Sequence, residues 1–272
     1  MSQANVIFNN STLINKLKQL LMNASDCILD IYHLSNLDIT IKSDNSPVTK
    51  ADIAAHTLLF NGLSSLTPNI PVISEEDNES LSISKSHSTY WLIDPLDGTK
   101  EFISRNGEFT VNVALIENNK PSLGFVYVPT QKTLYWGGAN YGSYKSIENS
   151  NKSKVICASY PQNPIRVVAS RNHLNQATID FIKTLGRTKL IKAGSSLKFL
   201  TIAEGKADYY PRFAPTSEWD TAAAHAILEG AGGKVNKVDG SNLSYGKLNI
   251  LNPSFIARGR ELIDNQVKVR QI

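Results

Sequence analysis

The spacing of apolar residues gives the first half of the chain a mixed α+β character. Helical spacing covers residues 13–31 and 55–63, and residues 38–41 and 70–73 have strand-like patterns. These patterns predict two amphipathic helices and two strands. Three apolar runs between residues 109 and 136, separated by polar turns, predict an antiparallel meander.

Strand-like and helical segments alternate in the second half, which predicts an α/β layer. The expected strands lie at 166–170, at 188–191 and near Val235 and Phe255, and the expected helices lie at 174–185, 197–204 and 221–228. Two prolines interrupt the pattern at residues 161–164. We therefore expect an amino-terminal α+β domain (residues 1–160) and a carboxyl-terminal α/β domain (residues 161–272).

A short apolar run at residues 91–93 ends in an acidic turn. Asp94 would emerge at the carboxyl end of the strand, and Pro95 bends the chain so that Asp97 can return to the same side. Two facing carboxylates repel each other, and a hard divalent cation removes that repulsion. The carbonyl of Leu96 could supply another oxygen ligand. The turn therefore predicts a metal site.

The residues that follow this turn suit an anion. Gly98 lets the backbone approach a ligand closely, and the amides of Gly98, Thr99 and Lys100 could open a helix onto a phosphate. A solvated surface turn is the alternative for the two acids and the glycine taken alone, because such turns are common.

Three further acids have a structural explanation as well as a functional one. Asp52 follows Thr49 at a helix start, and Asp220 follows Ser217 at another, so both acids can be capping residues. Glu75 comes directly after a predicted strand, where functional groups gather in α/β sheets, although a solvated acidic loop is the common alternative.

Two polar segments could lie beside such a site. Gly194, Ser195 and Ser196 separate a strand from a helix, so their amides and hydroxyls could hold a ligand or simply cap the helix. Residues 43–47 and the serine-rich residues 78–89 are expected to be loops, and the second could be a mobile lid.

The motif Asp94-Pro95-Leu96-Asp97-Gly98-Thr99 resembles the signature of the inositol monophosphatase superfamily of magnesium-dependent, lithium-sensitive phosphatases. Flanking segments make the resemblance closer to the 3'(2'),5'-bisphosphate nucleotidase branch; they are residues 100–102, 105–111, 194–199 and 210–213. The resemblance extends from the first predicted helix to about Phe255.

This resemblance implies a fold, a cofactor and a set of catalytic residues. The fold would be the layered α-β-α-β-α sandwich of the inositol monophosphatase and fructose-1,6-bisphosphatase type, with two or three Mg²⁺ ions in a cleft. The implied metal ligands are Glu75, Asp94, the carbonyl of Leu96, Asp97 and Asp220. The implied catalytic residues, which orient or deprotonate the attacking water, are Asp52, Thr99 and Glu75.

The resemblance also implies a substrate, adenosine 3',5'-bisphosphate, hydrolysed to AMP and phosphate. It leaves open 3'-phosphoadenylyl sulfate, the sulfate donor of sulfur assimilation, as a second substrate. The non-reacting phosphate needs cations, for which Arg212 offers bidentate binding and Lys100 and Lys198 offer point charges. Tyr210 could pack near the base, although it also suits a plain strand. The remaining implied substrate contacts are Gly98, Thr99, Gly194, Ser195, Ser196 and Asp220.

Composition agrees with an intracellular enzyme for an anionic substrate. The 272 residues are 41% hydrophobic and 19% charged, with a net charge of +4. The two cysteines form no disulfide framework, and no segment has the pattern of a secretory signal or a membrane span. We expect a cytoplasmic protein, a monomer or homodimer, and the resemblance leaves open peripheral attachment to the cytoplasmic face of the inner membrane.

Two alternative functions stay open. An inositol monophosphatase would keep the metal site but would need no pocket for a second phosphate. A non-enzymatic RNA-binding protein would need a clustered basic face, which the scattered lysines do not form, so we expect no nucleic-acid partner. The histidines show no zinc spacing, and no nucleophile motif occurs.

Overall fold

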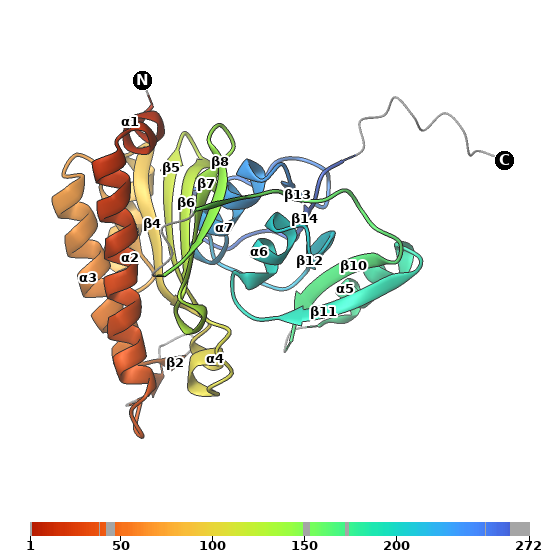
Figure 1. Cartoon of the computed structure of the whole chain (residues 1–272), viewed down its shortest axis with the longest axis horizontal. Helices are drawn as coiled ribbons and strands as arrows, with labels where there is room; N and C mark the ends of the chain where they lie inside the picture. The colour runs from red at the N-terminus through yellow and green to blue at the C-terminus, as the bar shows by residue number, and fades with distance from the viewer. Residues whose placement is uncertain are drawn as a thin grey trace.

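The computed structural model describes residues 2–37, 39–41, 47–148, 153–171, 174–247 and 249–261. These residues form five layers, α-β-α-β-α, as predicted (Figure 1). The first layer contains α1 (Gln3–Asn9), α2 (Ser11–Tyr32) and α3 (Lys50–Leu66), which cover one face of a seven-stranded sheet.

The large sheet has the order β3-β4-β5-β6-β7-β8-β9, with only β3 and β4 parallel. Its strands are β3 (Val72–Ser74), β4 (Thr89–Asp97), β5 (Thr110–Glu117), β6 (Lys120–Val128), β7 (Thr133–Gly138), β8 (Gly142–Ile147) and β9 (Lys154–Ile156). Most of β4, β5 and β6 is buried on both faces, which explains their nearly continuous apolar sequences. The meander predicted between residues 109 and 136 is therefore confirmed.

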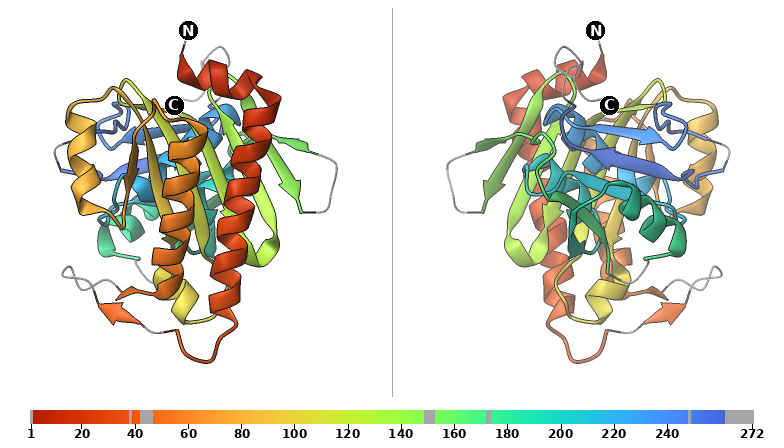
Figure 2. Two further views of the ribbon diagram at one scale, coloured as in Figure 1. Left: turned by 90° about the vertical axis from the view of Figure 1, so that its left-hand side faces the viewer. Right: turned by 90° about the vertical axis from the view of Figure 1, so that its right-hand side faces the viewer.

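The third layer consists of α6 (Leu197–Ala203) and α7 (Trp219–Gly230), which lie between the large sheet and a five-stranded sheet. The small sheet has the order β11-β10-β12-β14-β13; its strands are β10 (Ile165–Ser170), β11 (Thr188–Ala193), β12 (Tyr209–Arg212), β13 (Lys234–Lys237) and β14 (Phe255–Arg258). Helix α5 (Gln176–Thr184) lies on the outer side of this sheet (Figure 2).

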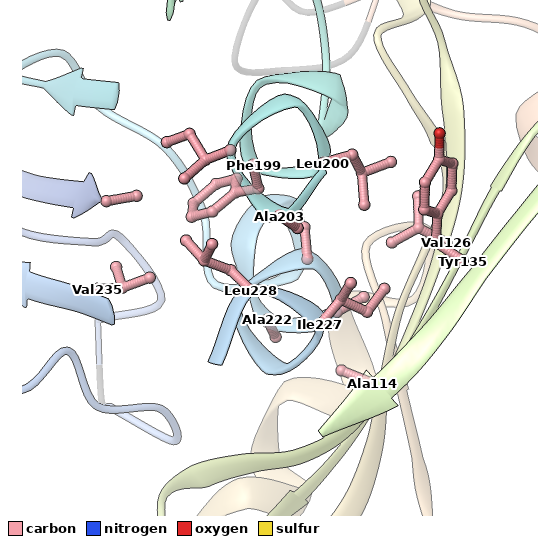
Figure 3. Close-up of a cluster of buried hydrophobic side chains, with 14 of the residues drawn as sticks. Ala114, Val126, Tyr135, Phe199, Leu200, Ala203, Ala222, Ile227, Leu228 and Val235 are labelled. Carbon is pink, nitrogen blue, oxygen red and sulfur yellow. The ribbon is translucent and has the colours of Figure 1, made fainter. Parts of the chain in front are cut away.

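The layers enclose two hydrophobic cores. One lies between α2, α3 and the large sheet and contains Leu17, Leu59 and Trp91. The other lies between the two sheets around α6 and α7, where Leu200 and Ile227 point toward the large sheet and Phe199 and Leu228 lie on the side of the small sheet (Figure 3). The second core spans both halves of the chain. The division at residue 160 stays a prediction, with the predicted boundary falling between β9 and β10.

Several local predictions need correction. The strand expected to end at Ile93 continues as β4 to Asp97, because a register shift between Asp94 and Asp97 accommodates Pro95. Part of the expected loop at 78–89 is a 3-10 helix, η1 (Asn78–Lys85), which Asp77 caps. Residues 209–212 form β12, which agrees with the strand alternative for Tyr210. The structure also adds α1, which the apolar spacing did not predict.

The remaining short elements are β1 (Thr40–Ile41), β2 (Pro47–Val48), α4 (Thr99–Ile103) and η2 (Pro129–Gln131). The loop expected at 43–47 lies outside the described residues except for its last residue, which begins β2. No helix in the described ranges has the length and apolarity needed to cross a lipid bilayer.

Candidate active site

Three acids from three elements meet at one edge of the large sheet. Carboxylate oxygens of Glu75, Asp94 and Asp220 lie within 4.8 Å of one another. Glu75 directly follows β3, and Asp94 lies in the parallel neighbour β4, so the ends of these strands place both acids on the same edge. Asp220 comes from the first turn of α7, which packs against the same sheet.

The acids raise one another's affinity for protons. Burial raises the pKa of Asp94 well above its ordinary value, and the charges of Glu75, Asp97 and Asp220 raise it further. Burial also raises the pKa of Asp220 well above its ordinary value, with Asp97 and Glu75 adding to the effect. A cation would remove this repulsion, and oxygen donors of this kind suit a hard divalent cation.

Asp97 lies beside the three acids and is held by residues of both halves of the chain. Its Oδ2 accepts hydrogen bonds from Ser195 Oγ (2.7 Å) and the Ser196 amide (2.8 Å). Longer contacts join the same oxygen to Asn112 Nδ2 (3.3 Å) and Thr110 Oγ1 (3.4 Å). These donors fix the orientation of the carboxylate.

Asp52 joins the start of α3 to the acidic turn. Its Oδ2 accepts hydrogen bonds from the amide and hydroxyl of Thr49, both at 2.7 Å, which confirms the capping box. Its Oδ1 accepts a hydrogen bond from Thr99 Oγ1 at 3.1 Å. The same hydroxyl lies 3.4 Å from the carbonyl of Leu96. Thr99 is therefore paired with Asp52, and capping of α3 coexists with this pairing.

A cavity of about 140 Å³ opens next to Asp97 and Asp220. Lys198 lines this cavity although only 7% of the residue is exposed, and burial lowers the pKa of its ammonium to about 8. Lys198 Nζ donates a hydrogen bond to the carbonyl of Ser195 at 2.6 Å and lies 5.5 Å from the ring centre of Tyr210. The cavity is thus lined by both cationic and acidic side chains.

Arg212 also lines the cavity, and its guanidinium is held by its own loop. Nε donates to the carbonyl of Ala214 (3.1 Å), and Nη2 donates to the carbonyl of Pro215 (2.8 Å). A guanidinium has five N–H donors, so further donors can face an anion. Tyr210 is 2% exposed and forms part of the wall.

The structure brings some predicted substrate contacts together and uses others internally. Gly98 and Ser195 line the cavity, whereas Lys100 is exposed on α4 and does not line it. Ser196 is buried and donates to the carbonyl of Asp220 at 3.1 Å. The amide of Gly194 donates to Glu108 at 2.8 Å. Direct contact of Gly194 or Ser196 with a substrate stays a prediction.

Thr110, Asn112 and Glu108 are among the residues of this site that were not predicted. Thr110 and Asn112 are both buried on one face of β5, and Asn112 Nδ2 donates to Ser196 Oγ at 3.0 Å. Two polar residues spaced by two in an otherwise apolar strand were the available signal, because buried polar groups need partners. Glu108 gave no comparable signal in the sequence.

Comparisons with known proteins place this geometry in a family. The sequence pattern of the inositol monophosphatase family matches residues 9–269. The 3'(2'),5'-bisphosphate nucleotidase CysQ of Salmonella typhimurium is 46% identical over 245 residues, which cover 89% of this chain and 98% of that protein. The protein of the same name from Buchnera aphidicola is 42% identical and covers 90% of this chain and 93% of its own.

Solved structures agree with the sequence comparison. CysQ from Bacteroides thetaiotaomicron, described as a bacterial member of the inositol monophosphatase family, has a TM-score of 0.82 and 40% identity; the match covers 93% of this chain and 99% of that one. Staphylococcus aureus SaIMPase-II with bound inositol monophosphate has a TM-score of 0.70 at 22% identity, with coverage of 92% and 89%. The second likeness is one of fold.

Proposed function

Because this chain belongs to the inositol monophosphatase family, we propose that it is a 3'(2'),5'-bisphosphate nucleotidase that hydrolyses adenosine 3',5'-bisphosphate to AMP and phosphate. The observation that carries this proposal is the meeting of Glu75, Asp94 and Asp220 beside a cavity that Lys198 and Arg212 line. Such a site combines acidic residues, which would hold metal ions against the reacting phosphate, with basic side chains that would bind a second phosphate.

Magnesium is the proposed cofactor, with two or three ions held by Glu75, Asp94, the carbonyl of Leu96, Asp97 and Asp220. When bound, these ions would supply charge neutralisation and activation of water. The donor set fits this assignment because it consists entirely of oxygen atoms.

Thr99 and Asp52 are proposed to orient the attacking water. The Thr99 hydroxyl donates to Asp52, so its lone pairs can accept a hydrogen bond from a water molecule. Glu75 is proposed as a third catalytic residue. The amides of Gly98 and Thr99, at the start of α4, would bind the oxygens of the scissile phosphate. Phosphoryl transfer depends mainly on such positioning and charge neutralisation.

The second phosphate is proposed to bind Lys198 and Arg212. A cavity of about 140 Å³ is smaller than the roughly 300 Å³ or more that encloses a drug-sized ligand, so the base would lie outside it. Lys100 is exposed and would contact only the part of the nucleotide that lies outside the cavity. Tyr210 would pack against Lys198 and would not stack on the base. Ser195 completes this proposed pocket.

The decisive measurement is phosphate release with Mg²⁺ from three substrates: adenosine 3',5'-bisphosphate, 3'-phosphoadenylyl sulfate and inositol 1-phosphate. We expect preference for the bisphosphate, some release from the sulfate donor, and a loss of at least about 10²-fold in kcat for Asp97→Asn. Preference for inositol 1-phosphate would discard the substrate and keep the site. Near-normal turnover by folded Asp97→Asn would discard the metal role of Asp97.

No metal-dependent release from any substrate would remove the enzyme proposal and favour the RNA-binding alternative. A cytoplasmic location, with or without peripheral attachment to the inner membrane, stays a prediction. So does the oligomeric state, monomer or homodimer, which light scattering would measure.

A further inference from the structure

Glu108 lies where two loops of the candidate site come together. It precedes β5, and its carbonyl oxygen faces the backbones of Gly98 and Gly194. A Cβ atom added at Gly98 would lie 3.2 Å from this oxygen, and one added at Gly194 would lie 3.0 Å from it. Both loops therefore approach Glu108 more closely than a residue with a side chain normally could.

The side chain of Glu108 connects this point to the ends of two neighbouring strands in the small sheet. Its Oε2 accepts a hydrogen bond from the amide of Gly194, which follows β11, at 2.8 Å. Arg171, which follows β10, donates from Nη2 to Oε1 at 2.6 Å and from Nε to Oε2 at 3.3 Å. Charge-assisted bonds of this kind are stronger and more directional than neutral ones.

The turn at residues 194–196 needs such an anchor because of its backbone conformation. Ser195 has a φ of 47°, in the left-handed region, which costs a residue with a side chain roughly 1 kcal/mol or more. This conformation directs both the Ser195 hydroxyl and the Ser196 amide to Asp97 Oδ2. Glu108 fixes the amide before Ser195, and Asp97 binds the amide after it.

We propose that Glu108 is a positioning residue for the carboxylate of Asp97, acting through the 194–196 turn. Glu108 sets the path of the turn, the turn supplies two of the donors that orient Asp97, and Asp97 presents its carboxylate to the metal site. The inference rests on the proposed metal role of Asp97. It adds a residue from outside the acidic turn to the residues that determine metal affinity.

The test is Mn²⁺ binding, measured by calorimetry without substrate, in the wild-type protein and in three variants. Glu108→Ala removes the acceptor of the Gly194 amide and should weaken Mn²⁺ binding about tenfold, the lower end of the range for residues that support metal ligands. Glu108→Gln keeps a carbonyl oxygen for this amide and should recover most of the affinity. Arg171→Ala removes only the ion pair and should have a smaller effect than Glu108→Ala.

Glu261→Ala is the matched control, because Glu261 is also a partly exposed, ion-paired glutamate and its partners Lys234 and Arg258 belong to the distant β13 and β14. Wild-type Mn²⁺ affinity in Glu108→Ala, with only a lower thermal midpoint, would overturn the proposal. Equal losses in Arg171→Ala and Glu108→Ala would also overturn it, since the ion pair alone would then explain the effect. The measurement needs no substrate, so it would stand even if the wild-type protein failed to hydrolyse bisphosphates.

Discussion

The hydroxyl of Thr99, which we propose orients the attacking water, is held at the acidic turn by Asp52. It donates to Asp52 at 3.1 Å, and Asp52 is 2% exposed and fixed by Thr49. Burial raises the pKa of Asp52, while its bonds to Thr49 and Thr99 oppose that rise. The carboxylate of Asp52 is therefore held between Thr49 and Thr99, and the Thr99 oxygen can still accept a hydrogen bond.

Replacing Thr99 should separate this role from simple packing. Thr99→Val keeps the shape and loses the hydroxyl, so kcat should fall by roughly 10²- to 10⁴-fold, the usual contribution of a positioned proton-transfer group. Thr99→Ser keeps the hydroxyl and should retain most of the turnover. Both variants are compared by steady-state kinetics at saturating Mg²⁺. Equal turnover in Thr99→Val and Thr99→Ser would show that the hydroxyl does not take part.

Lys198 should make substrate affinity depend on pH. Its pKa is about 8 because burial outweighs the attraction of Asp97, so the ammonium loses its proton as the pH rises through this value. We expect KM for the bisphosphate to rise about tenfold or more above pH 8, since a hydrogen bond to a charged group contributes about 1.5–3 kcal/mol. Lys198→Arg stays charged and should give a flat profile. A wild-type KM that stays constant from pH 7 to 9.5 would contradict this role.

The same lysine affects stability in a defined direction. Below pH 8 both the folded and unfolded chains hold the proton, and the full cost of burying the ammonium is present. Between about 8 and the ordinary value of 10.5 only the unfolded chain holds it, so this group makes the free energy of unfolding rise with pH. Other groups also titrate in this range. The difference in the free energy of unfolding between wild type and Lys198→Met, followed as a function of pH, therefore isolates the contribution of Lys198.

Among the elements, α7 determines where Asp220 lies. The helix packs so closely on β6 that a Cβ atom added at Gly124 would lie 2.0 Å from the carbonyl oxygen of Ala223. Because the backbones of β6 and α7 are in direct contact, a side chain at residue 124 could be accommodated only if the helix moved away from the strand. The position of Asp220 therefore depends on Gly124, in the middle of β6.

Gly124→Ala should therefore impair both stability and metal binding. Overpacking of this kind typically costs about 1–3 kcal/mol in the free energy of unfolding, and the shift of α7 should weaken Mn²⁺ binding as well. Urea unfolding and calorimetry measure the two effects. Gly62→Ala is the control, because its new Cβ would meet only the flexible side chain of Leu20 in the outer helical layer. Unchanged Mn²⁺ affinity in Gly124→Ala would show that Asp220 does not depend on this contact.

Local patterns determined which elements could be predicted from the sequence. The capping box of Thr49 and Asp52 spans four residues and needs no tertiary information, and it is present as predicted. The strands around Asp94 were equally readable, although the register shift that lets β4 continue past Pro95 depends on pairing with β5. Such pairing is not encoded in the spacing of one strand.

Partnerships between distant segments could not be predicted. Thr110 meets Ser195, which is 85 residues away, only because the two sheets pack around α6 and α7. Glu108 reaches Gly194 for the same reason. Asp94 and Asp97 were found because a motif groups them in the sequence, and Glu75 and Asp220 were implied by the family resemblance, whereas the residues that orient Asp97 are brought together only by the fold.

At the scale of the whole molecule, the proposed metal site joins the two halves of the chain. Asp94 and Asp97 belong to the large sheet and Glu75 directly follows its strand β3, while Asp220 and the serines that bind Asp97 come from segments after residue 160. Repulsion among these acids opposes the packing of α7 on the sheet. A cation bound by acids from both halves of the chain would neutralise this repulsion and hold the two halves together.

Magnesium should therefore stabilise the entire fold. At about 100 times its dissociation constant, a ligand that binds only the folded state adds about 2.7 kcal/mol to the free energy of unfolding. With an unfolding entropy of about 2.1 cal/mol/K per residue, a chain of this size should show a rise in Tm of roughly 5 °C. Thermal unfolding followed by circular dichroism, in EDTA and then in excess Mg²⁺, measures the shift.

Asp220→Asn distinguishes site-specific binding from general screening of charge. Burial and the charges of Asp97 and Glu75 raise the pKa of Asp220 well above its ordinary value, so removing its charge relieves repulsion in the metal-free protein. We expect this variant to have an equal or higher Tm than the wild type in EDTA and a much smaller rise with Mg²⁺. Choline chloride at matched ionic strength should not reproduce the wild-type rise, because the rise requires oxygen ligands that converge on one ion. An equal rise in Tm with choline chloride would mean that salt only screens the repulsion among the acids. The two halves of the chain would then not be linked by a cation bound between them.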